Sequence, residues 1–262
     1  MSNPLNGYWA NSGINQGDTV LIHSSMRRTF LEVARRGYKP TSEIVIESLL
    51  ELVGGTGTLL FPLFNFDFPV TKHFSLLSTS SQMGRVTEDA RLKLRGSRTG
   101  HPIYSVYAIG QNEKHFSKID NFSGYGSDSP FAKLRELDGK IAIIDLDDQH
   151  SMTFYHHVEE MHEVDYRYHK TFEGEYIDAK GTSSAKKYSL FVRDLDRGVQ
   201  TDVNQMGQIL WQNDLYIGSL PGIGNGMRSV SANLLFERTS LEITQGRALG
   251  TLYSIHKPAD GR

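Results

Sequence analysis

Apolar residues along the chain form short continuous runs that alternate with segments of helical periodicity. The runs at 18–23, 57–61, 104–109 and 140–145 predict buried strands. Between Thr41 and Val53 apolar residues recur at i, i+3, i+4 and i+7, which predicts a helix that ends at Gly54–Gly55. A second helix is predicted over 86–94. Strands that alternate with helices predict an α/β fold, a layered sheet with flanking helices.

Composition narrows the class of protein. The chain has 262 residues, 38% of them hydrophobic, with no internal repeat or Pro/Gly-rich linker, so we expect a single domain over 1–262. The absence of cysteine excludes a thiolate nucleophile, a zinc ribbon and a disulfide framework. A net charge of -2 lacks the basic excess of nucleic-acid binders. Without a signal peptide or a long apolar run, we expect a cytoplasmic protein with no membrane partner.

Acidic residues and histidines, which can act in catalysis or binding, are concentrated in the segment from Asp145 to Arg167. It holds seven acidic residues and four histidines, with no Lys or Arg before Arg167. It follows a predicted strand, and apolar residues at helical spacing from position 154 predict a helix with Ser151 as its N-cap. This helix therefore begins at the carboxyl edge of the sheet, where open α/β folds bind ligands.

On this helix Thr153, His156 and Glu159 follow one another at i, i+3 and i+6. Glu159 can accept a hydrogen bond from His156, which leaves the other ring nitrogen for a substrate and makes His156 a general base. A His and a Glu three residues apart are also a common surface pair, so the pattern alone leaves both interpretations open.

Metal binding is not predicted, because H-E-x-x-H is missing and only one Glu-x-x-His motif occurs. The alternative interpretation of the histidine cluster is a metal-dependent hydrolase in which these histidines bind the metal.

Other glycine-rich motifs do not indicate a nucleotide site. Gly222–Gly226 lacks the G-x-G-x-x-G spacing and is predicted to form a turn, and Gly54–Thr58 lacks the lysine of a P-loop. No G-x-S-x-G motif is present for serine chemistry.

Six segments in order along the chain resemble the aminoglycoside 3-N-acetyltransferase family, antibiotic N-acetyltransferases that are unrelated to the GNAT fold. The first resembles the family's G-D-x-x-x-x-H-S-S-L opening, and the last matches its T-x-x-H-x-x-E motif. The matching segments are Gly17–Met26, Gly55–Pro62, Met83–Arg91, Arg98–Gly110, Tyr125–Leu134 and Thr153–Glu159.

The resemblance implies the fold of that family and transfer of an acetyl group from acetyl-CoA to the 3-amino group of an aminoglycoside, without a metal. It implies that His156 is the general base, that Glu159 orients it and that Thr153 supports the same helical face. By the family pattern, the residues on the CoA side are His23, Ser24, Ser25, Arg98, His101, Ser105 and Ser129.

The acidic residues of the segment 145–167, here called the acidic run, bear on the identity of the acceptor. A cleft lined by their carboxylates would attract a polycationic aminoglycoside and would repel the phosphates of a nucleotide-linked sugar. The expected acceptor-side residues are Asp147, Asp148, Glu160, Glu163 and Asp165. The aromatic loop Phe61–Phe74 can stack a sugar or a base, so N-acylation of a biosynthetic amino sugar stays open. A non-catalytic amino-sugar or CoA-binding protein, and a homodimer, also stay open.

Overall fold

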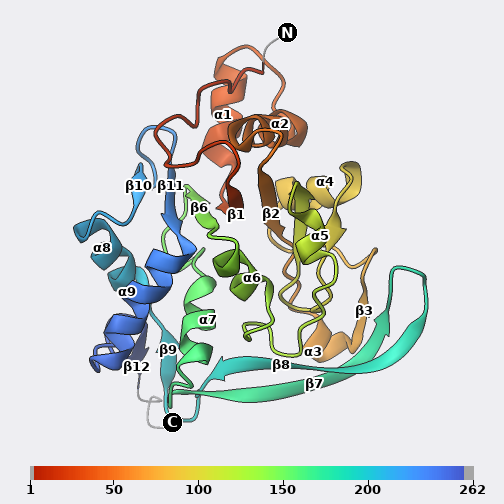
Figure 1. The fold of residues 1–262 in the computed structure, drawn as a ribbon, viewed down its shortest axis with the longest axis vertical. Coiled ribbons are helices and arrows are strands. Elements are labelled where there is room, and N and C mark those ends of the chain that lie inside the picture. The colour runs from red at the N-terminus through yellow and green to blue at the C-terminus, as the bar shows by residue number, and fades with distance from the viewer. Residues whose placement is uncertain (1–2, 257–262) are drawn as a thin grey trace, which may run out of the picture.

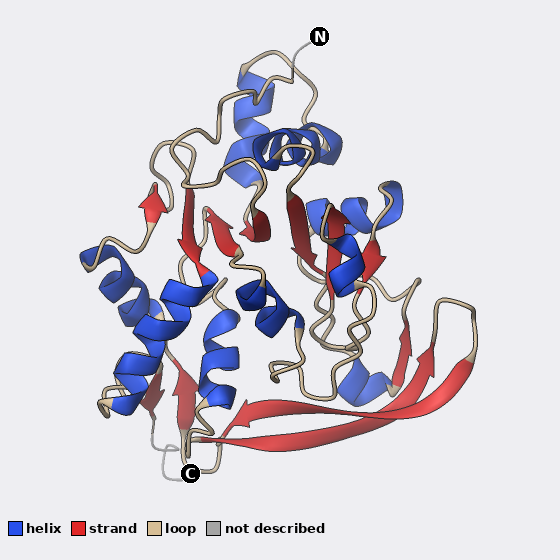
Figure 2. Cartoon of the chain, in the orientation of Figure 1, coloured by secondary structure: helices blue, strands red, loops and turns tan. Residues whose placement is uncertain are grey.

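The main sheet of the molecule is mixed and has seven strands. Figures 1 and 2 show it surrounded by helices. The computed structural model describes residues 3–256. Strand order is β10-β11-β6-β1-β2-β5-β4, in which β6, β1 and β2 are parallel and the other pairings are antiparallel. The strands of this sheet are β1 (Thr19–Ser24), β2 (Thr58–Pro62), β4 (Ser97–Arg98), β5 (Val106–Gly110), β6 (Lys140–Ile144), β10 (Ile217–Gly218) and β11 (Met227–Ser231).

Helices cover both faces of the sheet. They are α1 (Arg27–Arg35), α2 (Ser42–Val53), α3 (Phe68–Thr71), α4 (Arg85–Lys93), α5 (Glu113–Phe116), α6 (Pro130–Glu136), α7 (Phe154–Met161), α8 (Asn204–Gln212) and α9 (Ala232–Thr244). Within residues 3–256, no helix is both long and apolar enough to cross a membrane.

Alternation along the strands divides the interior into two apolar cores. Successive side chains of a strand point to opposite faces, so β1 contributes Leu21 to one core and Val20 and Ile22 to the other. Helices α6, α7, α8 and α9 contribute buried residues to the core that contains Leu21, and α1, α2 and α4 contribute to the core that contains Val20. The sheet is therefore a middle layer packed on both faces. The loops that follow its parallel strands β1, β2 and β6 leave from the same edge.

The predicted α/β fold and its main elements are confirmed. The four predicted strands correspond to β1, β2, β5 and β6, and the two predicted helices correspond to α2 and α4. Helix α2 begins after Thr41, whose hydroxyl accepts a hydrogen bond from the Ile44 amide at 3.4 Å. It ends at Gly54, whose φ of 68° suits glycine.

A long hairpin lies outside the main sheet and was not predicted. Its strands β7 (Arg167–Ile177) and β8 (Ser183–Arg193) pair antiparallel along their whole length, and β3 (His73–Ser75) runs parallel to β7. In Figure 1 the hairpin sweeps away from the base of α7. Strands β9 (Val199–Thr201) and β12 (Tyr253–Ile255) form a separate pair. Because β7 begins soon after α7 ends, the root of the hairpin lies beside the candidate site.

Candidate active site

The loop between β6 and α7 differs locally from the prediction. Ser151 is not the N-cap, because its hydroxyl donates to the Asp147 carbonyl at 2.5 Å. The helix begins at Phe154 with Thr153 in the N-cap position, and the Thr153 side chain makes no capping hydrogen bond. The Thr153 hydroxyl is therefore not committed to the helix end.

His156 and Glu159 lie within hydrogen-bond distance on α7. His156 Nδ1 is 2.7 Å from Glu159 Oε2, the His156 side chain is 17% exposed and that of Glu159 is fully buried. Glu159 Oε2 is also 2.8 Å from Nε of Arg167, the first residue of β7. With the carboxylate accepting from Nδ1–H, Nε2 is the ring nitrogen that can accept a proton.

The surroundings of the pair set its protonation states. Burial lowers the pKa of His156 and the Arg167 charge lowers it further, while Glu159 opposes both effects. Burial acts to raise the pKa of Glu159, but Arg167 and His156 together outweigh burial and hold that pKa below its usual value. At neutral pH the histidine is unprotonated and the glutamate is ionised, which are the states that a general base and its orienting group require.

A cavity of about 390 Å³ opens beside His156. It is lined by His23, Phe64, Phe66, Met83, Tyr104, residues 148–153, His156, Thr201 and Val203. A smaller pocket of about 60 Å³ is lined by Ser24, Met26, Phe30 and residues 83–86, and Met83 lines both spaces. The structure therefore brings His23, Ser24, Thr153 and His156 to one region at the carboxyl ends of β1 and β6.

Arg98 and Ser105, predicted on the CoA side, are buried and bonded to each other. Arg98 Nε donates to Ser105 Oγ at 2.9 Å, and its terminal nitrogens donate to the carbonyls of Leu63 at 3.1 Å and Thr79 at 2.5 Å. Ser105 Oγ donates to the same Leu63 carbonyl at 3.2 Å. In the described chain neither residue lines the cavity; both fasten the loop that carries Phe64.

The remaining residues predicted on the CoA side also make internal bonds. His101 Nδ1 accepts from the amides of Ile103 and Tyr104 at 3.2 and 3.1 Å. Ser129 caps α6 by accepting from the Ala132 amide at 3.3 Å. Ser25 is half-buried, and its amide donates to the Ile144 carbonyl at 2.8 Å. These three residues position segments around the cavity, and none is among the residues that line it within 3–256.

The acidic run is not gathered at the cavity. Asp148 lines the cavity, but its carboxylate accepts from the hydroxyls of Tyr155 and Tyr216, both at 2.7 Å, and pairs with Arg228 at 2.8 Å. Asp147 accepts from His150 at 2.6 Å on the neighbouring turn. The electrostatic argument for a polycationic acceptor is therefore not supported by Asp148, whose charge is matched by Arg228.

The other acids lie on different faces. Glu160 follows Glu159 on the helix, so it projects elsewhere and accepts from Ser123 at 2.8 Å, and burial raises its pKa. Glu163 is exposed after the helix end, and Asp165 lies 3.3 Å from Arg197.

Sequence reasoning missed Arg167 and Arg228, the buried cations that neutralise Glu159 and Asp148. Arg167 is the last residue of the segment that predicted the site and the first of β7, and Arg228 lies on β11, far outside that segment. No motif links either residue to its carboxylate. The only sequence signal for Arg167 is that no other Lys or Arg occurs between Asp145 and Arg167.

The histidines of this segment point in different directions. His157 Nδ1 lies 2.7 Å from the Tyr125 carbonyl, and His162 Nε2 lies 2.8 Å from Ser240 Oγ. Over the described residues, no three His, Asp or Glu side chains are grouped so that they can hold a metal ion.

The fold and the site define a class: an α/β protein with a histidine paired to a buried carboxylate at the carboxyl edge of its sheet. The family model for aminoglycoside 3-N-acetyltransferase matches residues 21–220, and the chain belongs to this family. It is therefore an acyltransferase.

Solved structures share the fold. Aminoglycoside acetyltransferase AAC(3)-Xa is 23% identical, with a TM-score of 0.73 and 89% of each chain covered. A binary structure of AAC-IIIb with CoASH is 19% identical, with a TM-score of 0.74 and 96% of this chain and 97% of that chain covered. AAC-VIa bound to sisomicin is 17% identical, with a TM-score of 0.71 and coverage of 90% and 94%. No curated protein matches the chain.

Proposed function

We propose that the protein transfers the acetyl group of acetyl-CoA to an amine of an aminoglycoside, at the 3-N position. The observation that carries this proposal is the His156 ring at the cavity wall, with Nδ1 held 2.7 Å from the buried carboxylate of Glu159. The family membership supports the reaction class. CoASH in AAC-IIIb and sisomicin in AAC-VIa, two proteins of the same fold, support the two substrates.

The geometry suits acyl transfer to nitrogen. Nε2 of His156 accepts the proton that the amine loses as its nitrogen bonds to the thioester carbonyl carbon. Ionised Glu159 stabilises the imidazolium that forms. When the carbon–sulfur bond breaks, the imidazolium returns the proton to the leaving thiolate, so the base is regenerated and the proton balance closes.

The two spaces around Met83 suggest how the substrates divide. We assign the smaller space, lined by Ser24, to the CoA thioester together with His23 on the wall of the larger cavity. We assign the part of the larger cavity lined by Phe64, Phe66 and Tyr104 to the acceptor, because flat aromatic faces suit sugar rings. The cytoplasmic location belongs to this proposal as a prediction from the sequence alone, and the sequence leaves both a monomer and a homodimer open.

Thiol release from acetyl-CoA, followed with a thiol reagent, tests the proposal. The chain contains no cysteine, so the protein contributes no background. We expect acceptor-dependent release with a deoxystreptamine aminoglycoside. Release with a nucleotide-linked amino sugar alone would reassign the acceptor, and no release with any amine would indicate a non-catalytic binding protein. Loss of activity with a chelator would indicate a metal-dependent reaction.

Replacing the base gives the sharpest test of the mechanism. His156→Ala should lower turnover by about 10² to 10⁴ because the general base is lost, with little change in the Kd for CoA. His115→Ala, at an exposed position on α5, is the matched control. Unchanged turnover in the His156 variant would contradict the assignment.

A further inference from the structure

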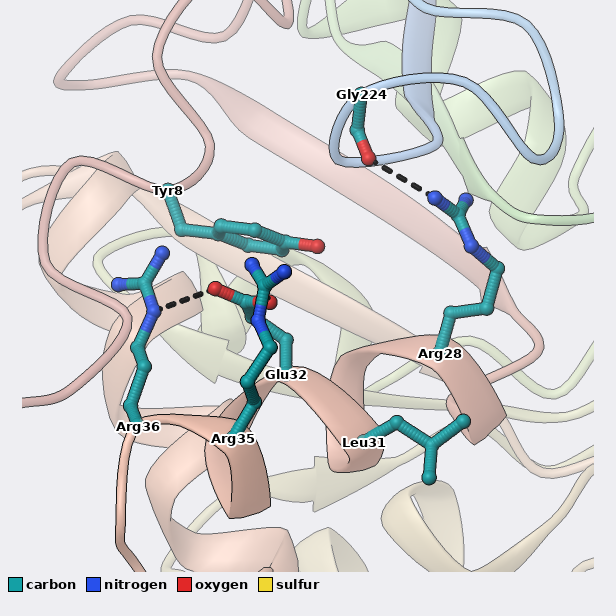
Figure 3. Close-up of a pocket in the computed structure, with 7 residues that line it drawn as sticks. All are labelled: Tyr8, Arg28, Leu31, Glu32, Arg35, Arg36 and Gly224. Carbon is teal, nitrogen blue, oxygen red and sulfur yellow. Dashed lines mark hydrogen bonds and ion pairs between the residues drawn. The ribbon is translucent and has the colours of Figure 1, made fainter.

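A second pocket, here called the arginine pocket, lies between α1, the N-terminal segment and the Gly222–Gly226 turn. Its volume is about 450 Å³, and Figure 3 shows its lining: Tyr8, Arg28, Leu31, Glu32, Arg35, Arg36 and Gly224. It shares no lining residue with the His156 cavity. It joins α1 to the glycine-rich turn, and the proposed reaction uses no residue of either.

Positive charge exceeds negative charge in the arginine pocket. Glu32 pairs with Arg35 at 2.5 Å and with Arg36 at 2.6 Å, and Arg28 lies 2.5 Å from Asp145. Three guanidinium groups thus face two carboxylates, which leaves a net charge of about +1 at neutral pH. Each guanidinium has five N–H donors, so donors remain after these pairings. The Arg35 side chain is 79% exposed and open to a ligand.

The walls of the arginine pocket are held in place by internal bonds. Arg28 Nη2 donates to the Gly224 carbonyl at 3.0 Å, and the Gly222 amide donates to Asp145 Oδ1 at 2.9 Å. Asn225 Nδ2 donates to the Tyr8 carbonyl at 2.7 Å, which ties the N-terminal segment to the turn. The pocket is therefore largely pre-formed, which lowers the entropic cost of binding.

Tyr8 adds an aromatic face to this basic site. The Arg36 guanidinium carbon lies 5.3 Å from the centre of the Tyr8 ring. In Figure 3 the ring lies beside the Arg35 and Arg36 side chains, with its hydroxyl end toward Arg28.

We propose that the arginine pocket binds the diphosphate of a nucleotide, with the Tyr8 ring beside the base or ribose. Guanidinium groups match phosphate oxygens in charge and in fork geometry, and an aromatic ring can pack against a nucleobase. Two sources carry this chemistry: the ADP portion of CoA itself, and a nucleotide-linked amino-sugar acceptor. Binding by the pocket does not depend on the proposed reaction; only the choice between the two sources depends on it.

Calorimetric titration of the whole protein with ADP and pyrophosphate tests the site directly. We expect ADP to bind at low ionic strength and to bind more weakly as salt rises. Arg35→Gln and Arg36→Gln should each weaken ADP binding about tenfold, because each removes charge-assisted hydrogen bonds to phosphate. Arg27→Gln removes the same charge from an exposed position of α1 outside the pocket and should leave ADP binding unchanged. Absence of ADP binding, or equal weakening in all three variants, would overturn the proposal.

The same variants distinguish the two sources. A parallel rise in the Kd for CoA assigns the arginine pocket to the acyl donor. An unchanged Kd for CoA with a raised KM for a nucleotide-linked amino sugar assigns it to the acceptor. Because ADP binding is measured without turnover, a failure of the acetyltransferase assay leaves this result standing, so the two proposals can fail separately.

Discussion

Glu159 is a fully buried carboxylate that contacts two basic side chains, His156 at 2.7 Å and Arg167 at 2.8 Å. Removing a carboxylate from water is costly, so it stays ionised only where a partner compensates. Arg167, whose side chain is 4% exposed, supplies that compensation, so Glu159 can stay ionised beside a neutral His156. The same cation that keeps Glu159 ionised also lowers the pKa of His156, which favours its unprotonated form.

Removing the charge of Glu159 tests this arrangement. Glu159→Gln should lower turnover by about 10² to 10⁴, because the imidazolium loses its counter-charge. It should also lower the free energy of unfolding by about 3 to 5 kcal/mol, because Arg167 is left as an uncompensated buried charge. Steady-state kinetics and urea denaturation measure the two effects, with Glu163→Gln at an exposed position as the control. Full activity in the Glu159 variant would exclude a role for its charge.

The rate should depend on pH through His156. Its pKa lies below the ordinary value of 6.5, and the mechanism we propose requires His156 to be unprotonated. Activity should therefore be constant above about pH 7 and fall as pH drops through the lowered pKa. Measurement of kcat/KM between about pH 5 and 8 checks this, and a midpoint for the acid limb at or above 7 would contradict it.

Among the elements, the loop from β6 to α7 determines where the cavity wall lies. Asp148 in this loop bonds to Tyr155 on α7, to Tyr216 before β10 and to Arg228 on β11. One carboxylate therefore links the loop to α7, to β11 and to the segment that precedes β10. The acid that the sequence suggested for substrate attraction instead holds the loop that connects β6 to α7.

Asp148→Asn should consequently destabilise the fold. The amide keeps one acceptor but leaves the buried Arg228 without its counter-charge, so the free energy of unfolding should fall by about 3 kcal/mol or more. Asp147→Asn, whose side chain is 43% exposed, should change it by less than about 0.5 kcal/mol. Chemical denaturation compares the two variants, and equal stabilities would show that Asp148 does not anchor the loop.

Across the whole molecule, three buried histidines make stability sensitive to acid. Burial lowers the pKa of His23, His101 and His157 to about 4 in each case. In the unfolded chain these groups titrate near 6.5. Below that pH the unfolded state therefore binds more protons than the native state does. This contribution to stability is complete above pH 6.5 and is lost as pH falls from 6.5 towards 4.

We therefore expect the free energy of unfolding to decline between about pH 6.5 and 4, by about 1 to 3 kcal/mol for each buried histidine. Urea denaturation at several pH values measures the slope. His157→Gln removes one of the three titrations and should flatten the decline, whatever its effect on stability at pH 7. A decline confined to pH values below 4 would assign acid unfolding to carboxylates alone.

The sequence alone determined the features that depend on neighbouring residues. Apolar periodicity predicted β1, β2, β5, β6, α2 and α4, because a strand or helix buries one face at a fixed repeat. It also placed His156 and Glu159 on one helical face, since residues three apart on a helix are adjacent. The resemblance of its motifs to the aminoglycoside 3-N-acetyltransferases identified the family, which the family model confirms.

Only the tertiary structure decided which charges are available to a substrate. Arg167 and Arg228 reach Glu159 and Asp148 from other elements, and Arg98 and His101 bond to loops around the cavity. The β7–β8 hairpin was missed because most of β7 is exposed and β8 buries four consecutive residues, so neither strand shows the alternation of a half-buried strand. Periodicity records which face of an element is buried, but the partner of a buried charge depends on how distant elements pack, and no local pattern encodes that.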